Sequence, residues 1–134
     1  DFEGYFETIY LCHVLEHFPL HDVPRTLSVF YNLLADSGTI YISVPDFEIL
    51  SSIYLARRVS LDYIVRAIHG GQEYPENTHY ISFDLPLLTR FLQSVGFRSI
   101  SRYSPLEFLP CDVVDTSTYE IGMKQISLNL CALK

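Results

Sequence analysis

Residues 7–46 read ETIYLCHVLEHFPLHDVPRTLSVFYNLLADSGTIYISVPD, and this stretch decides the fold. It combines an apolar run, a polar elbow at His13–His17, a segment with helical spacing, a Ser-Gly turn and a second apolar run ending at Pro45–Asp46. A strand, a helix and a second strand in that order predict a βαβ unit. Because open parallel sheets bind ligands beyond the carboxyl ends of their strands, both elbows are predicted to lie at a functional edge.

Four apolar runs predict the strands of one sheet. The first shows little alternation of apolar and polar residues, which favours a strand buried on both faces. Residues Asp36–Gly38 are predicted to form the turn before the second strand, and Pro45 to end that strand because proline cannot donate to a central ladder. The four runs are Thr8–Val14, Thr39–Val44, Phe97–Tyr103 and Gln125–Leu133.

Three segments have apolar residues at helical spacing. Asp22, Ser60 and Asp84 are predicted to cap helix N-termini, and Gly96 to end the last helix in a left-handed conformation. The connection Gly70–Phe83, at about fourteen residues, is longer than an ordinary loop and is therefore predicted to be functional. The helical segments are residues 22–34, residues 47–69 with a break before Ser60, and residues 84–96.

Composition limits the classes of function. The chain has 134 residues, of which 49% are hydrophobic, enough for one core, so a single domain over residues 1–134 is predicted. Its net charge of −7 provides no basic surface for nucleic acid or for an anionic membrane. No apolar run approaches the roughly 20 residues needed to span a bilayer. Three cysteines, Cys12, Cys111 and Cys131, favour reduced thiols, and we expect a cytoplasmic protein.

Five short motifs carry a resemblance to a known family. They are FETIYLCHVLEHF (6–18), DSGTIYISVPD (36–46), GGQEYPENTHYISFD (70–84), LLTRFLQSVGF (87–97) and ISLNLCALK (126–134). In this order they resemble the carboxyl-terminal half of class I S-adenosylmethionine-dependent methyltransferases. More narrowly, they are similar to predicted bacterial methyltransferases with an LEH elbow and a GG...N.H loop. The resemblance covers essentially the whole chain and carries no information about the methyl acceptor.

The resemblance implies an α/β fold with part of a Rossmann-like methyltransferase sheet. The four predicted strands would be the fourth to seventh of that sheet, in the order four, five, seven, six, with the last strand antiparallel and helices on both faces. The family's glycine loop and ribose-binding carboxylate would lie before Asp1. We therefore expect the chain to be the carboxyl-terminal part of a methyltransferase domain, which binds S-adenosylmethionine weakly or not at all by itself.

The same resemblance implies candidate cofactor residues. Cys12, His13 and Val14 match the strand end whose backbone, in this family, faces the methionine part of the cofactor.

The elbow and the long loop supply the other candidate site residues. Histidine readily exchanges a proton near neutral pH, so His17 suits a catalytic base, with Glu16 and His79 completing the predicted catalytic set. Asp46 and Asn77 are predicted to bind the substrate, a small-molecule or sugar-like acceptor. The alternative is structural: the elbow residues cap the next segment, and the loop residues bond to the loop's own backbone.

The elbow also matches the H-x-x-E-H signature of one class of zinc hydrolases. That signature requires a helix of several turns to bring both histidines to the metal. Here a predicted strand runs into His13, and Pro19 follows shortly after His17. No metal site is therefore predicted.

A second class of function stays open. The chain would then be a non-catalytic or half-site module that associates with another chain. Thr8–Val14 would have an unpaired apolar edge, which favours a twofold homodimer.

Overall fold

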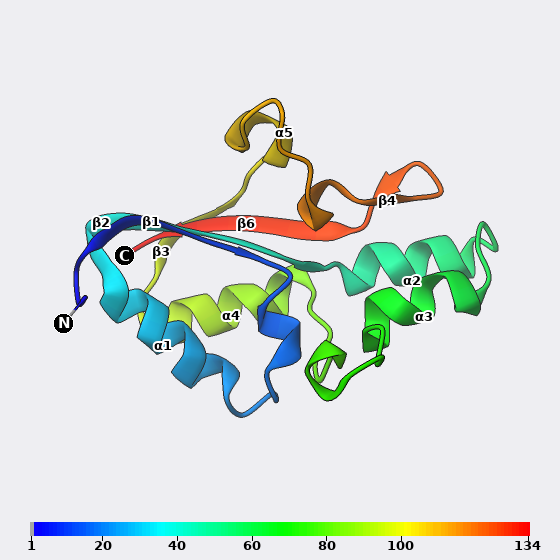
Figure 1. Cartoon of the computed structure of the whole chain (residues 1–134), viewed down its shortest axis with the longest axis horizontal. Coiled ribbons are helices and arrows are strands. Elements are labelled where there is room, and N and C mark those ends of the chain that lie inside the picture. The colour runs from blue at the N-terminus through cyan, green and yellow to red at the C-terminus, as the bar shows by residue number, and fades with distance from the viewer. Residues whose placement is uncertain (1) are drawn as a thin grey trace.

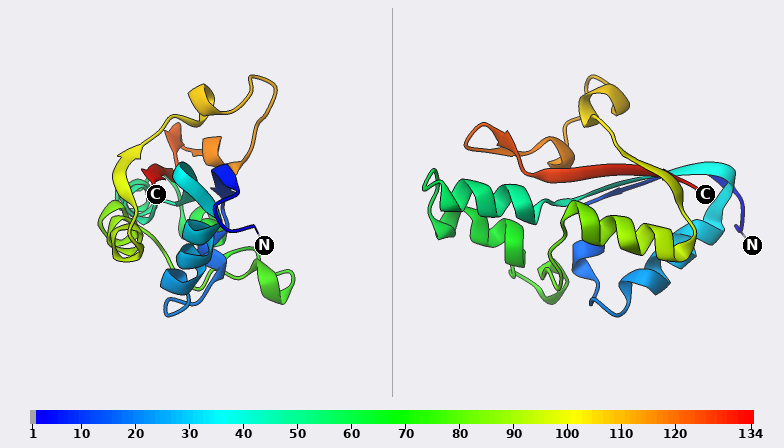
Figure 2. Two further views of the ribbon diagram at one scale, coloured as in Figure 1. Left: turned by 90° about the vertical axis from the view of Figure 1, so that its left-hand side faces the viewer. Right: turned by 180° about the vertical axis from the view of Figure 1, so that it is seen from behind.

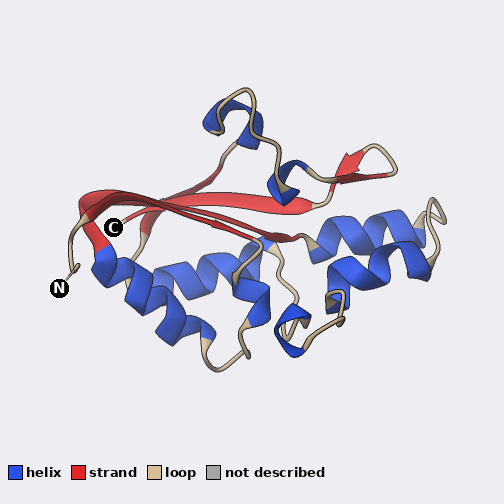
Figure 3. Cartoon of the chain, in the orientation of Figure 1, coloured by secondary structure: helices blue, strands red, loops and turns tan. Residues whose placement is uncertain are grey.

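The computed structural model describes residues 2–134, which form one mixed sheet with helices around it (Figures 1 and 3). The sheet has four strands in the order β1-β2-β6-β3. Strand β1 (Phe6–Cys12) is parallel to β2 (Leu34–Pro45). Strand β6 (Ser127–Leu133) is antiparallel both to β2 and to β3 (Arg98–Arg102). This order and the antiparallel last strand confirm the prediction.

The two faces of the sheet differ in chemistry because side chains alternate along each strand. Ile40, Ile42 and Val44 of β2 lie in the main core and are fully buried. Tyr41 and Ser43 alternate with them and face the opposite side. One face of the sheet is therefore aliphatic, and the other is polar and aromatic.

Strand β1 corrects one expectation. It lies at an edge of the sheet, paired only with β2 among the described residues. Leu11 is its only buried residue, and the partly buried Ile9 packs against the core. Tyr10 lies on the polar face, where its hydroxyl donates to Asp115. The prediction of burial on both faces was wrong because the aromatic and polar side chains of this run face away from the core.

The two longest helices cover the aliphatic face (Figures 1 and 2). They are α1 (Val23–Leu33) and α4 (Leu85–Val95), whose Leu27, Leu88 and Leu92 are fully buried. The other face carries a segment with only short helical turns, α5 (Pro105–Phe108) and η3 (Thr116–Thr118). Helices thus lie on both faces of the sheet, but the aliphatic face has two long helices and the polar face has only short helical turns.

A second unit extends beyond the carboxyl end of β2 (Figure 1). Helices α2 (Phe47–Leu55) and α3 (Leu61–His69) lie side by side there. Near them is a two-stranded ribbon of β4 (Glu120–Ile121) and β5 (Lys124–Gln125). This unit has its own small core, formed by Leu50, Ile53, Ile64 and Ile126. Among the described residues, no helix has both the length and the apolar character needed to cross a membrane.

Several predicted boundaries change. Residues Asp36–Gly38 do not separate helix from strand, because β2 begins at Leu34 and runs through them. They form an irregularity in β2: Ser37 is left-handed (φ 65°), and the pairing with β1 jumps from Leu34 to Thr39. A Cβ at Gly38 would lie 2.9 Å from the Ala35 carbonyl oxygen, which explains the glycine. The last strand begins at Ser127 rather than Gln125 because β5 is a separate strand.

The predicted caps are confirmed in part. Asp84 accepts a hydrogen bond from the Leu87 N–H at 2.8 Å, and Gly96 ends α4 with a φ of 116°. Asp22 and Ser60 occupy N-cap positions, but their side chains make no capping bond.

Candidate functional site

The elbow after β1 is a sharp turn followed by one turn of 3₁₀ helix. His13 has a left-handed backbone (φ 54°), and its N–H donates to the Ser43 carbonyl. The 3₁₀ turn η1 spans Leu15–His17 and buries Leu15 and Glu16. The zinc hydrolase alternative needs a longer helix through His13 and His17, so this alternative is wrong.

The long loop returns to the elbow, and η2 (Pro75–Asn77) lies within it. The Tyr80 N–H donates to the Glu16 carbonyl at 2.8 Å. His79 Nε2 then lies 4.0 Å from Glu16 Oε1, and the His79 and His17 rings meet edge to face with centroids 4.7 Å apart. The predicted convergence of Glu16, His17 and His79 is confirmed as geometry, while their catalytic role stays a prediction.

Glu16 has an unusual environment. Its side chain has 0% exposure, and neither carboxyl oxygen has a hydrogen-bond partner in the described part of the chain. His13 Nδ1 lies 3.1 Å from Glu16 Oε1, close enough for an ion pair but without hydrogen-bond geometry. A buried carboxylate without hydrogen bonds is costly, so something must compensate it.

The partners of His13 define where a proton can lie. Its Nε2 is 2.9 Å from Ser127 Oγ, whose hydroxyl donates to the Thr116 carbonyl. Since that hydroxyl proton is used, His13 Nε2 must donate. A further proton can lie on either side of the 3.1 Å gap between His13 Nδ1 and Glu16 Oε1. On His13 it gives an imidazolium beside a carboxylate, and on Glu16 it gives a neutral imidazole beside a neutral carboxyl group.

The other two histidines are oriented by backbone carbonyls. His17 Nδ1 is 3.2 Å from the Thr78 carbonyl oxygen, and His79 Nδ1 is 3.0 Å from that of Ala67. A carbonyl only accepts, so both rings carry a proton on Nδ1, which leaves each neutral Nε2 as a base. Burial lowers the pKa of His79, although the Glu16 charge opposes this, and the neutral form is therefore favoured.

Asp46 lies at the same edge of the sheet as the elbow, because β1 and β2 are parallel and Cys12 pairs with Ser43. Its carboxylate is 2% exposed and accepts from the Glu48 and Ile49 N–H groups, which caps α2. Burial raises the pKa of Asp46, against the lowering effect of these bonds and of Arg102. Asp46 thus supports the start of α2, and its predicted contact with substrate stays a prediction.

Asn77 does not join the cluster. Its amide donates to Glu73 Oε2 at 2.6 Å, and its backbone carbonyl accepts from the Gln72 N–H. Glu73 in turn accepts from Arg66 of α3. The geometry matches the structural alternative for Asn77, in which the loop bonds to itself.

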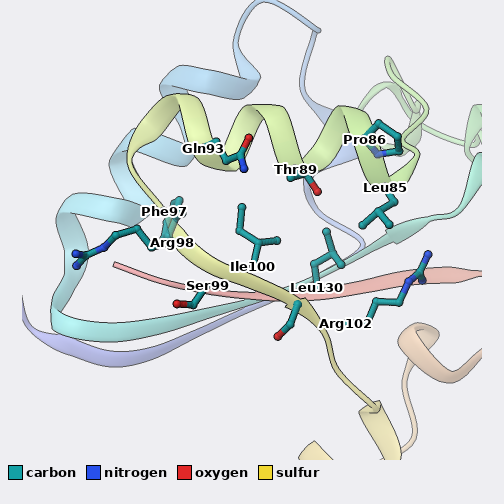
Figure 4. A pocket seen from close by; sticks show the side chains of 11 residues that line it. Leu85, Pro86, Thr89, Gln93, Phe97, Arg98, Ser99, Ile100, Arg102 and Leu130 are labelled. Atoms are coloured by element: carbon teal, nitrogen blue, oxygen red, sulfur yellow. The ribbon is translucent and has the colours of Figure 1, made fainter.

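A cavity of about 290 Å³ lies beside the cluster. His13 and His79 line it, together with Tyr63, Thr116 and Tyr119. A second cavity, of about 570 Å³, lies between α4 and β3 and contains none of the predicted site residues (Figure 4). The smaller cavity is therefore the one that the candidate site can use.

Sequence reasoning missed the polar residues that hold the end of β1. Cys12 Sγ lies 3.1 Å from Thr116 Oγ1, and Ser127 positions His13. Ser43 bonds to Asn129 on the same face of the sheet. The available signal was alternation, because serine, asparagine and cysteine occupy every second position in SLNLC of β6.

Comparisons with known proteins identify the family. A family model described as "Methyltransferase domain" matches residues 1–102. Among solved structures, the chain is similar to a SAM-dependent methyltransferase from Archaeoglobus fulgidus, with 18% identity and a TM-score of 0.57 over 99% of this chain. An O-methyltransferase family protein from Burkholderia thailandensis has 14% sequence identity and a TM-score of 0.56 over 99% of this chain. The CurJ carbon methyltransferase has 17% identity and a TM-score of 0.53 over 98% of this chain.

These structural relatives show the fold alone, because their sequence identities are low. The chain spans 61% of the first of them and 32% and 30% of the other two. A search of the curated proteins found no match. The family model covers most of the sequence, and the solved structures share the fold. The chain belongs to the methyltransferase domain family.

Proposed function

We propose that the chain takes part in S-adenosylmethionine-dependent methyl transfer and provides the carboxyl edge of the sheet where cofactor and acceptor meet. The observation that carries the proposal is the match of residues 1–102 to the methyltransferase family, on a sheet with the order β1-β2-β6-β3. Sites in open α/β sheets gather at this edge. The elbow and the long loop both reach it.

The cofactor supplies a methyl group on a positively charged sulfur. The backbone of Cys12, His13 and Val14 at the end of β1 would hold its methionine part. The left-handed turn at His13 redirects the chain where the strand ends. Methyltransferases of this kind work mainly by positioning, so a rigid strand end is a suitable support.

His17 and His79 would accept the proton that the acceptor loses as it attacks the methyl group. Each has a free Nε2 because a backbone carbonyl fixes the proton on Nδ1. The acceptor would bond to the methyl carbon as the carbon–sulfur bond breaks, and its proton would pass to the Nε2 of the histidine. Glu16 lies within reach of His79 and would stabilise the resulting imidazolium.

The acceptor would be a small molecule or a sugar-like compound. The cavity beside His79 is only about 290 Å³ and includes two tyrosines, Tyr63 and Tyr119. A space of this size suits a small substrate with an apolar or ring-shaped part. The structural relatives include both an O-methyltransferase family protein and a carbon methyltransferase, so they do not choose the attacking atom.

Saturation-transfer NMR tests the proposal from the side of the ligand. The 134-residue sequence has no glycine-rich loop before β1, so we expect a dissociation constant weaker than micromolar, the level that corresponds to roughly −8 kcal/mol. The methionine protons of S-adenosylmethionine should receive more saturation than the adenine protons, and NAD should receive little. Equal transfer to NAD, or transfer only to adenine, would contradict the proposal.

A second candidate function is a module that associates with another chain. The observation in its favour is a cluster of exposed aromatic rings, Phe2, Tyr5 and Phe6, at the start of the edge strand β1. Phe2 and Phe6 are stacked, and Tyr5 meets each of them edge to face. Cofactor titration separates the two candidates, because only the first requires a ligand at Cys12–Val14.

A further inference from the structure

A buried carboxylate and two oriented imidazoles face one another at the elbow. Glu16, His17 and His79 each offer a ligand atom, and these atoms lie within 4.8 Å of one another. Glu16 is fully buried, and neither of its oxygens has a hydrogen-bond partner among residues 2–134. An unpartnered carboxylate in such a place points to a cation that compensates it.

The hydrogen bonds of the two histidines favour the same conclusion. Both Nδ1–H groups donate to backbone carbonyls, those of Thr78 and Ala67. This arrangement is typical of metal-binding histidines, because it fixes the tautomer and turns the Nε2 lone pair toward the metal.

The distances suit a small divalent ion. Metal–ligand bonds of about 2.0–2.2 Å place neighbouring ligand atoms roughly 3.0–3.6 Å apart. His79 Nε2 and Glu16 Oε1 are 4.0 Å apart, and the three ligand atoms lie within 4.8 Å of one another, so the side chains would have to approach one another by roughly 1–2 Å to bind one ion. The His17 and His79 rings come from η1 and from the long loop, and both segments are held by the Tyr80–Glu16 backbone bond.

We propose that Glu16, His17 and His79 bind a divalent transition-metal ion of the Zn²⁺ class. Two imidazoles and one carboxylate are a ligand set for zinc and related ions, and they leave at least one coordination position open. This set differs from the H-x-x-E-H arrangement, because His79 from the long loop takes the place that His13 would have there. A bound metal ion would occupy the Nε2 atoms of His17 and His79, so these atoms cannot hold the metal and accept the acceptor's proton at the same time. Metal binding is measured without cofactor, so the proposal does not depend on methyl transfer.

The competing occupant of the site is a proton. His13 Nδ1, 3.1 Å from Glu16 Oε1, could carry that proton and compensate the carboxylate without any metal. The two cases differ in the residues that matter. A metal requires His17 and His79, whereas a proton requires His13.

Co²⁺ and Zn²⁺ binding to the full 134-residue chain, stripped of metal with a chelator, tests the proposal. We expect one Co²⁺ per chain, with the ligand-field bands of a four- or five-coordinate ion, and displacement by Zn²⁺. Glu16→Gln, His17→Ala and His79→Ala should each weaken binding by on the order of 100-fold or more, since even outer partners of a metal typically cost 10–100-fold.

His21→Ala is the matched control, because His21 has an 83% exposed side chain and lies outside the cluster. It should bind the metal like the unsubstituted chain. No stoichiometric binding, or binding that survives in folded His17→Ala and His79→Ala, would overturn the proposal. If these variants do not fold, the Co²⁺ spectrum of the unsubstituted chain decides: bands of the hexaaqua ion overturn the proposal, and bands of a nitrogen-ligated ion support it.

Discussion

Asp84 and Ser60 each precede a helix, but only Asp84 caps one with its side chain. Asp84→Ala should therefore lower the free energy of unfolding by about 1 kcal/mol, the usual cost of a lost cap. Ser60→Ala is the matched control and should cost a few tenths of a kcal/mol at most. Urea denaturation of both variants measures the difference. Equal losses would show that the Asp84–Leu87 bond does not stabilise α4.

Asp115 ties the segment after β3 to the sheet. It accepts from the Tyr10 hydroxyl at 2.6 Å and from the Ser117 N–H at 2.9 Å. Burial raises the pKa of Asp115, but the bonds from Ser117 and Tyr10 outweigh it, so the pKa lies below its ordinary value of 3.8. A lowered carboxyl pKa stabilises the fold above the unfolded-state pKa, and this contribution is lost as the pH falls through the folded-state value.

Asp115→Asn should lower the melting temperature near neutral pH and reduce the further loss on acidification below about pH 5. Thermal unfolding over this pH range measures both effects. Asp112→Asn is the control, because the Asp112 side chain is exposed and its charge should contribute little. An acid dependence of Asp115→Asn like that of the unsubstituted chain would show that Asp115 makes no such contribution.

Some of the individual residues of the candidate site could be predicted from the sequence. Glu16, His17 and His79 were predicted to converge because their segments reach the carboxyl edge of one sheet. Ser127, the partner of His13, and Thr116, which accepts from Ser127, were not predictable. They lie more than 100 positions along the chain from His13, and their place depends on how that segment folds over the sheet.

At the scale of elements, the strand order was predictable and several boundaries were not. The βαβ pattern predicts that β1 and β2 pair, and the resemblance to methyltransferases predicts that β6 and β3 follow in that order. The irregularity at Asp36–Gly38 was not predictable because Asp-Ser-Gly is equally suited to a turn. The small core around Ile53 was not predictable either. It includes Ile126, which the sequence pattern assigns to the last strand but which precedes that strand in the structure.

The edge strand β1 carries the prediction of a homodimer. Its outer side is unpaired among the described residues, and exposed aromatic rings adjoin its start. Thr8→Lys puts a charge on an exposed position of this edge and should shift a dimer toward monomer. Ile9 is less suitable, because its side chain packs against the core.

Sedimentation velocity over a range of concentrations measures the effect. Met123→Lys is the matched control, because Met123 is 92% exposed and lies at the tip of the β4–β5 ribbon, away from β1. It should leave the association unchanged. A clean monomer for the unsubstituted chain at high concentration would contradict the dimer prediction.

In the whole molecule, the proposed function depends on the carboxyl edge of the sheet. Elbow, long loop and the 290 Å³ cavity meet there, whereas the cavity between α4 and β3 lies elsewhere. The position of this chain as the carboxyl-terminal part of a longer methyltransferase domain stays a prediction, consistent with the 61% of the Archaeoglobus fulgidus structure that it spans.

The most direct test of the account is a map of the S-adenosylmethionine contacts on the protein. The ¹⁵N-labelled chain is titrated with millimolar cofactor, and its amide chemical shifts are followed by NMR. We expect the largest shifts at Cys12, His13 and Val14, with little change at Thr89 and Gln93 in the cavity between α4 and β3. Shifts centred on Thr89 and Gln93, or none at the end of β1, would contradict it.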